Sequence, residues 1–209
     1  MYTTVRQHLA LHQADRQYTA QIRKYGCTPA GVHWKNLQTQ RERFQLLCEI
    51  IESREDSRHL SVLDFGCGYG ALWKYLLEKR YQGTYLGYDR NKEMIEMATD
   101  LHQHPNVRFV RDSIVQESAD LTFISGTFNL KMSAPSDVWW AYIQRQLTAL
   151  WNKTHTALAF NILLPSMYPL STLYYGNTSE VLNFCRELTD NVQWKVAPTI
   201  GDLNVYLRR

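Results

Sequence analysis

Residues 62–70 hold three glycines at alternate positions, directly after a short apolar run, in the sequence VLDFGCGYG. The apolar and aromatic residues of this run favour a buried β-strand. Gly66, Gly68 and Gly70 have no Cβ atom, so the backbone can take positive φ angles and bring its N–H groups close to a ligand. The helix predicted next, over residues 69–79, directs its positive end at the turn. The stretch therefore predicts a strand, a ligand-binding turn and a helix.

A second strand is predicted over residues 84–89, and it ends in Asp89, nineteen residues after Gly70. A carboxylate at the end of this strand can accept hydrogen bonds from both ribose hydroxyls of an adenosine-type cofactor. The glycine turn and Asp89, in this order, predict a nucleoside-bearing ligand at the carboxyl edge of a parallel sheet.

Strands and helices alternate through the rest of the chain. After residue 60 the expected strands cover 61–65, 84–89, 107–110, 121–124, 156–163, 192–197 and 204–207, and the expected helices cover 69–79, 91–101, 135–151 and 178–190. This alternation predicts an α/β fold with a doubly wound, seven-stranded, mostly parallel sheet and helices on both faces. The last two strands are expected to form a C-terminal antiparallel hairpin.

Two further helices are expected before the sheet, over residues 4–24 and 37–53. We expect residues 1–55 to form an N-terminal helical cap or lid. Residues 56–209 are expected to form one compact domain, with charged residues at the junction.

The apolar positions of these two helices differ in spacing. The first helix is polar, and its sparse apolar positions are Leu9, Tyr18 and Ile22. The second has an apolar stripe at helical spacing, made of Leu37, Phe44, Leu47, Ile50 and Ile51. Asn91 and Ser136 are expected to cap the helices that begin at those positions, because their side chains can accept hydrogen bonds from free backbone N–H groups.

Asp64 followed by Gly-x-Gly-x-Gly resembles the first motif of class I S-adenosylmethionine-dependent methyltransferases. Dinucleotide-binding domains more often carry Gly-x-Gly-x-x-Gly. In this chain the third glycine, Gly70, comes one residue early, and Ala71 occupies the place that the dinucleotide pattern would give it. The closing antiparallel hairpin is also what class I methyltransferases add to the sheet. The resemblance covers about residues 60–209, and it implies S-adenosylmethionine as the cofactor and methyl transfer as the activity.

The resemblance implies a partner for each part of the cofactor. The backbone of residues 66–68 would lie against the amino-acid tail and ribose, Asp64 would help to hold the ammonium group, and Asp89 would take the ribose hydroxyls. Asp112 would accept a hydrogen bond from the adenine amino group, and the backbone N–H of Ser113 would donate to the ring. For each carboxylate, formation of a turn or a helix cap is the alternative. The expected cofactor-binding residues are Asp64, Gly66, Cys67, Gly68, Gly70, Asp89, Arg90, Asp112, Ser113, Ser125, Trp34 and Arg43.

Trp34 and Arg43 belong to the N-terminal cap. An arginine on a helix above the cofactor tail can bind the tail carboxylate through two parallel hydrogen bonds. Arg41 competes with Arg43 for this role, and an exposed position on a solvated helix face is the alternative for both. Aromatic rings near the sulfonium group would also have a role, because cations favour π faces.

Residues 125–129 (SGTFN) follow the fourth predicted strand, where an acceptor would meet the methyl group. Enzymes that methylate the adenine amine or the glutamine amide carry Asn/Asp-Pro-Pro-Tyr/Phe there. This chain does not, which argues against those acceptors. Asn129 is a candidate to orient a polar group of the acceptor, with stabilisation of the loop as the alternative. His33 is a candidate general base, along with His155 and Tyr168, and a base is needed only if the acceptor is protonated.

Several aromatic residues are candidates for the wall of an acceptor pocket. The expected pocket residues are Tyr18, Tyr25, Trp139, Tyr174 and Tyr175, with partial burial in the outer layer of the protein as the alternative for each. The compact build of the chain, with no appended RNA- or protein-binding module, predicts a small-molecule acceptor.

Other functions remain open from the sequence. One is an NAD(P)-dependent oxidoreductase, since Arg90 beside Asp89 suggests a partner for a 2′-phosphate. Tyr75 and Lys79 match the Tyr-x-x-x-Lys spacing of reductases, but in those enzymes the pair follows a later strand. Another is a catalytically silent, cofactor-binding scaffold subunit. A nucleic-acid or protein acceptor also remains open.

Composition argues against several further classes. The net charge is +3, with no block of Lys or Arg, so a nucleic-acid partner is not indicated. The four cysteines form no Cys-x-x-Cys pair, and His8 and His12 lack a third ligand, so neither a disulfide framework nor a metal site is expected. There is no apolar run of about 18 residues, and residues 1–16 lack the apolar core of a signal peptide. We therefore expect a cytoplasmic protein that does not enter the membrane. The sequence leaves the oligomeric state unknown.

Overall fold

The computed structural model describes residues 5–52 and 58–209 of the chain. The expected boundary between residues 55 and 56 falls outside the described residues. The division into a cap and a compact domain therefore stays a prediction.

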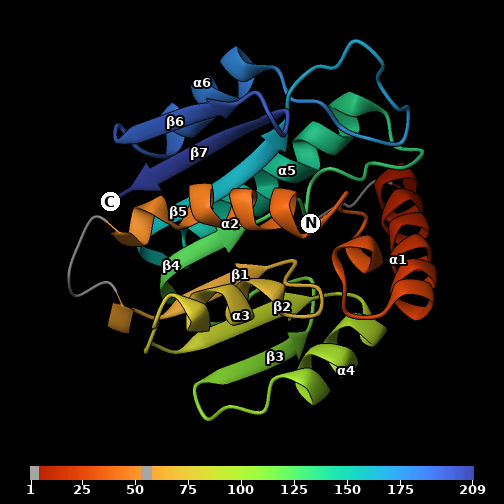
Figure 1. The fold of residues 1–209 in the computed structure, drawn as a ribbon. Coiled ribbons are helices and arrows are strands. Elements are labelled where there is room, and N and C mark those ends of the chain that lie inside the picture. Colours follow the sequence, from red (N-terminus) through yellow and green to blue (C-terminus); the bar gives the residue numbers. More distant parts are fainter. Residues whose placement is uncertain (1–4, 53–57) are drawn as a thin grey trace.

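Seven strands form one sheet in the order β3-β2-β1-β4-β5-β7-β6 (Figure 1). Neighbouring strands from β3 to β5 are parallel, and β7 runs antiparallel to both β5 and β6. The predicted mostly parallel sheet with a C-terminal antiparallel hairpin is confirmed. The strands are β1 (Val62–Phe65), β2 (Tyr85–Asp89), β3 (Val107–Arg111), β4 (Ala119–Ile124), β5 (Thr154–Leu163), β6 (Val192–Ala197) and β7 (Asp202–Arg208).

Helices cover both faces of the sheet, as predicted. Successive side chains of a strand point to opposite faces. In β5, Ala157 and Ala159 pack into a core with α2 and α3, whereas Leu158 and Phe160 pack into a second core with α5 and α6. The helices are α1 (Val5–Tyr25), α2 (Leu37–Glu52), α3 (Ala71–Glu78), α4 (Lys92–Leu101), α5 (Ser136–Trp151) and α6 (Thr178–Leu188), and a 3₁₀ turn, η1 (Pro29–Val32), follows α1.

Helix α1 stands across the carboxyl ends of the central strands (Figure 1). It contacts η1, α4 and α5. Its buried face carries Ala10, Ala14 and Ile22, and the two alanines allow a close approach to the domain. Leu9, an expected apolar position of this helix, is 51% exposed. α1 therefore closes one side of the space above the sheet edge.

The helix starts agree with the sequence in part. Asn91 caps α4 as predicted, since its side chain accepts a hydrogen bond from the backbone N–H of Met94. Ser136 was the wrong choice for the cap of α5, because Pro135 occupies the cap position and Ser136 is already helical. Leu37 is 56% exposed in the first turn of α2, so it does not extend that helix's apolar stripe. None of the described helices is both long and apolar enough to cross a membrane.

Candidate active site

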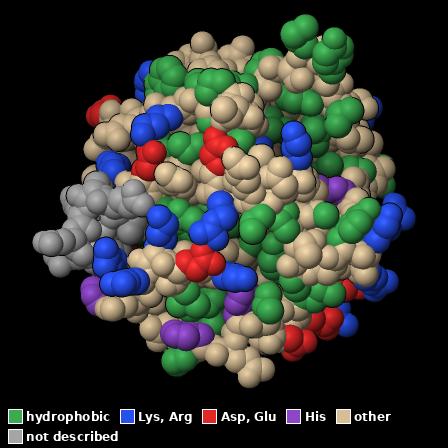
Figure 2. All heavy atoms as spheres, in the orientation of Figure 1, with side chains coloured by type: hydrophobic (Ala, Val, Ile, Leu, Met, Phe, Trp, Pro, Cys, Tyr) green, Lys and Arg blue, Asp and Glu red, His purple; other side chains and the backbone are tan. Residues whose placement is uncertain are grey.

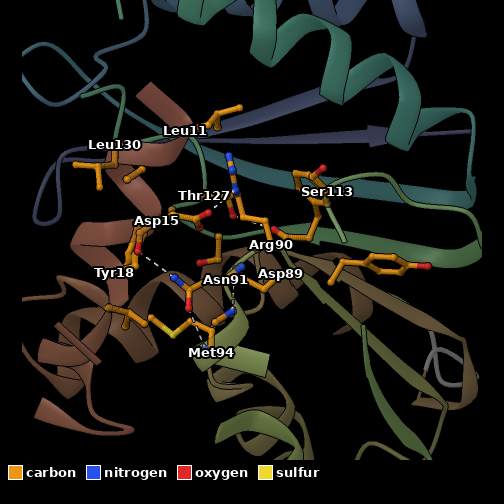
Figure 3. A pocket seen from close by; sticks show the side chains of 18 of the residues that line it. Leu11, Asp15, Tyr18, Asp89, Arg90, Asn91, Met94, Ser113, Thr127 and Leu130 are labelled. Atoms are coloured by element: carbon orange, nitrogen blue, oxygen red, sulfur yellow. Dashed lines mark hydrogen bonds and ion pairs between the residues drawn. The ribbon is translucent and has the colours of Figure 1, made fainter. Parts of the chain in front are cut away.

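A cavity opens at the carboxyl edge of the sheet, beneath α1, and we call it the main cavity (Figure 3). It encloses about 860 Å³ when the solvent space at its open mouth is included. Its walls come from α1, from the turn after η1, from the ends of β1, β2, β3 and β4, and from α5. Chain segments that are far apart in the sequence therefore meet around one space.

The glycine turn forms the part of the wall that follows β1. Gly66, Gly68 and Gly70 have φ angles of 79°, 55° and 78°, which are in the left-handed region that favours glycine. A Cβ added to Gly66 would stand 2.9 Å from the Cβ of Thr127 and nearer still to its Oγ1 and Cγ2 atoms. Gly66 and Gly68 line the main cavity, but Gly70 lies against His102 and outside it. The first two glycines therefore leave the backbone open to the cavity, and their role in cofactor binding stays a prediction.

Asp89 lies at the end of β2, beside the glycine turn (Figure 3). Its carboxylate accepts hydrogen bonds from the backbone N–H groups of Gly68, at 3.0 Å, and Asn91, at 2.8 Å. Burial raises the pKa of Asp89 to about 6, although both hydrogen bonds favour the charged form. Asn91, and not Asp89, caps α4. The Asp89 side chain lines the main cavity. This position fits a partner for ribose hydroxyls.

A smaller space, the tail cavity, lies behind the glycine turn and is lined in part by Gln40, Asp64 and Tyr69. Asp64 is 2% exposed and accepts a hydrogen bond from the Tyr85 hydroxyl. Burial raises the pKa of Asp64 to about 7, the Tyr85 hydrogen bond opposes that rise, and the charge of Asp89 adds to it. The tail cavity therefore offers a buried carboxylate that a ligand ammonium group would complement.

Trp34 and Ser125 line both cavities and connect them. The Ser125 Oγ atom is buried and has no hydrogen-bond partner among the described residues. A polar ligand that extends from one cavity into the other would satisfy it. Together with the carboxylates of Asp64 and Asp89, this donor and acceptor set fits the ribose and amino-acid parts of S-adenosylmethionine.

Arg90, Asp112 and Ser113 also line the main cavity. The Asp112 carboxylate accepts hydrogen bonds from the backbone N–H groups of Ser113, at 2.7 Å, and Ile114, at 2.9 Å. It therefore forms a turn and faces the cavity at once, so the two sequence interpretations of Asp112 are compatible. Arg90 pairs with Asp15 of α1 at 3.2 Å.

Arg43 lies outside both cavities, with its guanidinium paired to Asp202. The same group lies over the Trp34 ring, 4.7 Å from its centroid. Arg41 pairs with Glu78. Neither arginine points at the expected cofactor tail, because each has an acidic partner of its own. Cys67 lines the tail cavity.

The expected acceptor residues divide into two groups. Tyr18 and Trp139 line the main cavity. Tyr25 is exposed beside Lys24, Tyr174 stacks on Trp140, and the Tyr175 hydroxyl accepts the Leu170 N–H. These last three do not line the cavity, because local partners hold them elsewhere.

The two expected catalytic residues stand next to the main cavity and do not line it. The His33 ring packs edge-to-face on Tyr18, with centroids 5.4 Å apart, and burial lowers the pKa of this histidine. Asn129 belongs to the loop after β4, and its backbone N–H donates to the Gly126 carbonyl at 3.2 Å. Their catalytic roles stay predictions.

Sequence reasoning missed several residues that line the main cavity. On α1 these are Leu11, Ala14 and Asp15, whose spacing with Tyr18 places them on one helix face. This spacing could have indicated a cavity-lining face, but the helix is polar overall and has few apolar positions. The others are Val32, Phe65, Tyr88, Asn91, Met94, Gly126, Thr127, Leu130 and Tyr142.

Known proteins resemble this chain in sequence and in fold. Residues 62–159 match the family model described as a methyltransferase domain. A protein of Mycobacterium tuberculosis described as a methyltransferase is 28% identical over 130 residues, which cover 60% of this chain and 78% of that relative. The trans-aconitate 2-methyltransferase of Deinococcus radiodurans is 30% identical over 108 residues, which cover 52% of this chain and only 39% of that relative.

Solved structures agree on the fold. Magnesium protoporphyrin IX methyltransferase from Synechocystis with bound S-adenosylhomocysteine aligns with a TM-score of 0.66 at 11% identity, covering 82% of this chain and 84% of that one. These findings favour methyl transfer over the hydride transfer and scaffold alternatives. The strand order, the glycine turn with its two carboxylates and the match over residues 62–159 together identify a methyltransferase domain with the class I fold, whose cofactor is S-adenosylmethionine.

Proposed function

We propose that this enzyme methylates a small molecule that binds beneath α1. The observation that carries the proposal is the position of α1, whose Leu11, Ala14 and Tyr18 line the main cavity. An acceptor held there is enclosed between the helix and the sheet edge. A folded protein surface or a duplex would need α1 to move away.

Hydrogen bonds and ion pairs hold α1 against the rest of the domain, over the main cavity. The Asn91 side chain donates to the Asp15 carbonyl at 3.0 Å and to the Thr19 hydroxyl at 2.9 Å. Arg90 pairs with the Asp15 side chain, and Arg23 pairs with Glu93. On the other side of the helix, Gln13 accepts a hydrogen bond from the Ser133 hydroxyl at 2.6 Å. These contacts tie the helix to two different parts of the domain.

The surface charge also favours a small acceptor. In the face shown in Figure 2, basic side chains are interspersed with acidic, apolar and neutral ones and form no continuous band. Nucleic-acid-binding surfaces instead gather Lys and Arg along the path of the phosphates.

The residues of the chain would act mainly by holding and orienting the reactants. The bound cofactor supplies a methyl group on a positively charged sulfur. Asp89 would fix the ribose, Asp64 the ammonium group, and Trp34 would offer an aromatic face between the two cavities. α1 would exclude water from the acceptor. Placing two reactants in the right geometry can lower a barrier by several kcal/mol, on the order of 7–11 in favourable cases.

The test separates cofactor binding from acceptor choice. Calorimetric titration with S-adenosylhomocysteine should show binding, and a screen for S-adenosylhomocysteine release should find turnover with small molecules. Matched reactions with total RNA and with a protein mixture serve as controls. Turnover on either macromolecular sample, with none on small molecules, would contradict the proposal.

A further inference from the structure

The main cavity has two chemically different ends. The ends of β1, β2 and β3 supply the expected cofactor partners, such as Gly68, Asp89 and Asp112. The remaining wall belongs to α1, to the loop after β4 and to α5, and its apolar members include Leu11, Leu130 and Trp139. Figure 3 shows Leu11 and Leu130 at the side of the cavity away from Met94. We call this second part the acceptor end.

The charges around the main cavity do not suit an anion. Its charged lining side chains are Asp15, Asp89, Asp112 and Arg90. The single guanidinium is already paired with Asp15. Among the described residues no other Arg, Lys or His side chain lines this cavity. The carboxylates outnumber the guanidinium by more than the single net positive charge that the cofactor brings. An anionic acceptor would therefore enter without a cationic partner.

The acceptor end also has little to offer a charged group of either sign, because the carboxylate that α1 contributes, Asp15, is already paired with Arg90. The Trp139 Nε1–H donates to the Phe128 carbonyl at 2.8 Å, and the Thr127 hydroxyl donates to the Phe65 carbonyl at 2.8 Å. The Tyr18 and Tyr142 hydroxyls remain as polar groups on the wall, and burial raises the pKa of both, so they stay neutral. A charge buried against these side chains would lack compensation. A cation would in addition lie close to the positive sulfur.

We propose that the acceptor is an uncharged, largely apolar small molecule whose body lies against Leu11, Leu130 and Trp139. This inference rests on the proposed function of the same cavity. The Tyr18 and Tyr142 hydroxyls are hydrogen-bonding groups available to the one polar atom that such an acceptor must present. Leu11, Leu130 and Trp139 are positioned to select for shape and hydrophobicity.

Three ligands with one ring and different charges test the proposal at pH 7.5: 4-propylphenol, 4-propylbenzoate and 4-propylbenzylamine. Each is titrated into protein saturated with S-adenosylhomocysteine. We expect 4-propylphenol to bind at least tenfold more tightly than either charged analogue. Tighter or equal binding of a charged analogue, or no binding of any of the three, would overturn the proposal. Failure to bind S-adenosylhomocysteine in the first titration would instead count against the proposed function.

A matched pair of variants locates the preference. Leu11→Arg places a cation at the acceptor end, and we expect it to remove or reverse the tenfold preference for the phenol over the benzoate. Leu9→Arg makes the same change on the exposed side of the same helix and should leave the preference intact. Both variants are first titrated with S-adenosylhomocysteine to show that the fold is retained. If Leu11→Arg does not fold, the three-ligand comparison on the unaltered protein still decides the question.

Discussion

Arg43 of α2 forms an ion pair with Asp202, which is fully buried in β7. The same carboxylate accepts a hydrogen bond from the Asn161 side chain at 2.6 Å, and Asn161 in turn accepts the Gly126 N–H at 2.7 Å. Because Arg43 also lies over the Trp34 ring, this buried network reaches both Trp34 and the loop after β4. A contact remote from the cofactor therefore supports two parts of the cavity wall.

Arg43→Ala should reduce the free energy of unfolding by about 3–5 kcal/mol, because it leaves the buried Asp202 carboxylate without its cation. Arg41→Ala is the matched control on the same helix. It removes an ion pair between half-exposed side chains, with Glu78, and should cost at most about 1 kcal/mol. Urea denaturation of both variants measures the difference. Equal losses of unfolding free energy would show that the buried Arg43–Asp202 pair stabilises the fold no more than the exposed pair of Arg41 with Glu78.

The location of Arg43 shows where sequence reasoning stops. The sequence placed an arginine of this helix near the cofactor tail, because the helix was expected to cover the site. Its actual partner, Asp202, lies 159 residues away in the chain, and no local pattern links the two. Asn161 was equally hidden, since it is the one polar residue in the apolar part of β5, residues 157–163. Contacts between distant segments depend on register, which composition and periodicity do not give.

The parts that were predictable depend on local chemistry. Asp89 and the glycine turn are joined by one strand–turn–helix unit and the next strand, so their order in the sequence fixes their proximity. The sheet followed from alternation of strands and helices, and its closing hairpin from two short strands at the end. The cavity-lining face of α1 was missed because Leu11 and Ala14 are too few to stand out in a polar helix.

Asp89→Asn should weaken S-adenosylhomocysteine binding by about 10- to 150-fold, which corresponds to losing about 1.5–3 kcal/mol from hydrogen bonds to a charged group. The amide keeps the size of the side chain but loses one acceptor and the charge. Asp100→Asn, at an exposed position on α4, is the control and should leave affinity unchanged. Calorimetric titration compares the two. Unchanged affinity in the Asp89 variant would show that this carboxylate does not contribute to cofactor binding.

Binding of S-adenosylhomocysteine should weaken as the pH falls, because the ligand ammonium group prefers the ionised form of Asp64. With a pKa of about 7, the carboxylate is mostly protonated at pH 6. Affinity should therefore be about tenfold lower at pH 6 than at pH 8, with proton release on binding. Titrations at both pH values in buffers of different ionisation enthalpy measure both effects. A flat profile would contradict the role of Asp64.

Asp64 gives the stability of the ligand-free fold the opposite dependence on pH. Folding raises the pKa of Asp64 above its ordinary value of 3.8, so the folded chain binds the extra proton. This group thus destabilises the ligand-free fold as the pH rises from about 4 to about 7. Asp64→Asn should flatten both profiles. Tyr85→Phe removes a hydrogen bond that favours the ionised carboxylate, so the midpoint of binding should move to higher pH.

Gly66→Ala should destabilise the fold more than Gly26→Ala. Both glycines have positive φ angles, 79° and 62°, so both alanines carry a similar backbone cost of about 1–2 kcal/mol. Only the Cβ at Gly66 would collide, against Thr127, whereas a Cβ at Gly26 meets nothing within 4 Å. The collision should add about 1–3 kcal/mol. Thermal unfolding of the pair isolates this term, and equal losses would mean that Thr127 moves aside freely.

Asn91→Ala should loosen α1 as well as destabilise α4. Its side chain caps α4 through Met94 and also donates to the Asp15 carbonyl and the Thr19 hydroxyl of α1. Asn177 caps α6 in the same way, through Glu180 at 3.1 Å, and within the described part of the chain its side chain makes no hydrogen bond to α1. Each alanine variant should lose about 1 kcal/mol of stability through its cap.

Only the Asn91 variant should also show faster amide exchange across α1 and faster release of S-adenosylhomocysteine, because only it frees the helix that covers the cavity. Hydrogen exchange followed by mass spectrometry and stopped-flow displacement measure the two rates. The Asn177 variant corrects both for the general loss of stability. Equal exchange of α1 in the two variants would mean that the remaining contacts of the helix, such as Arg90 with Asp15, hold it without Asn91.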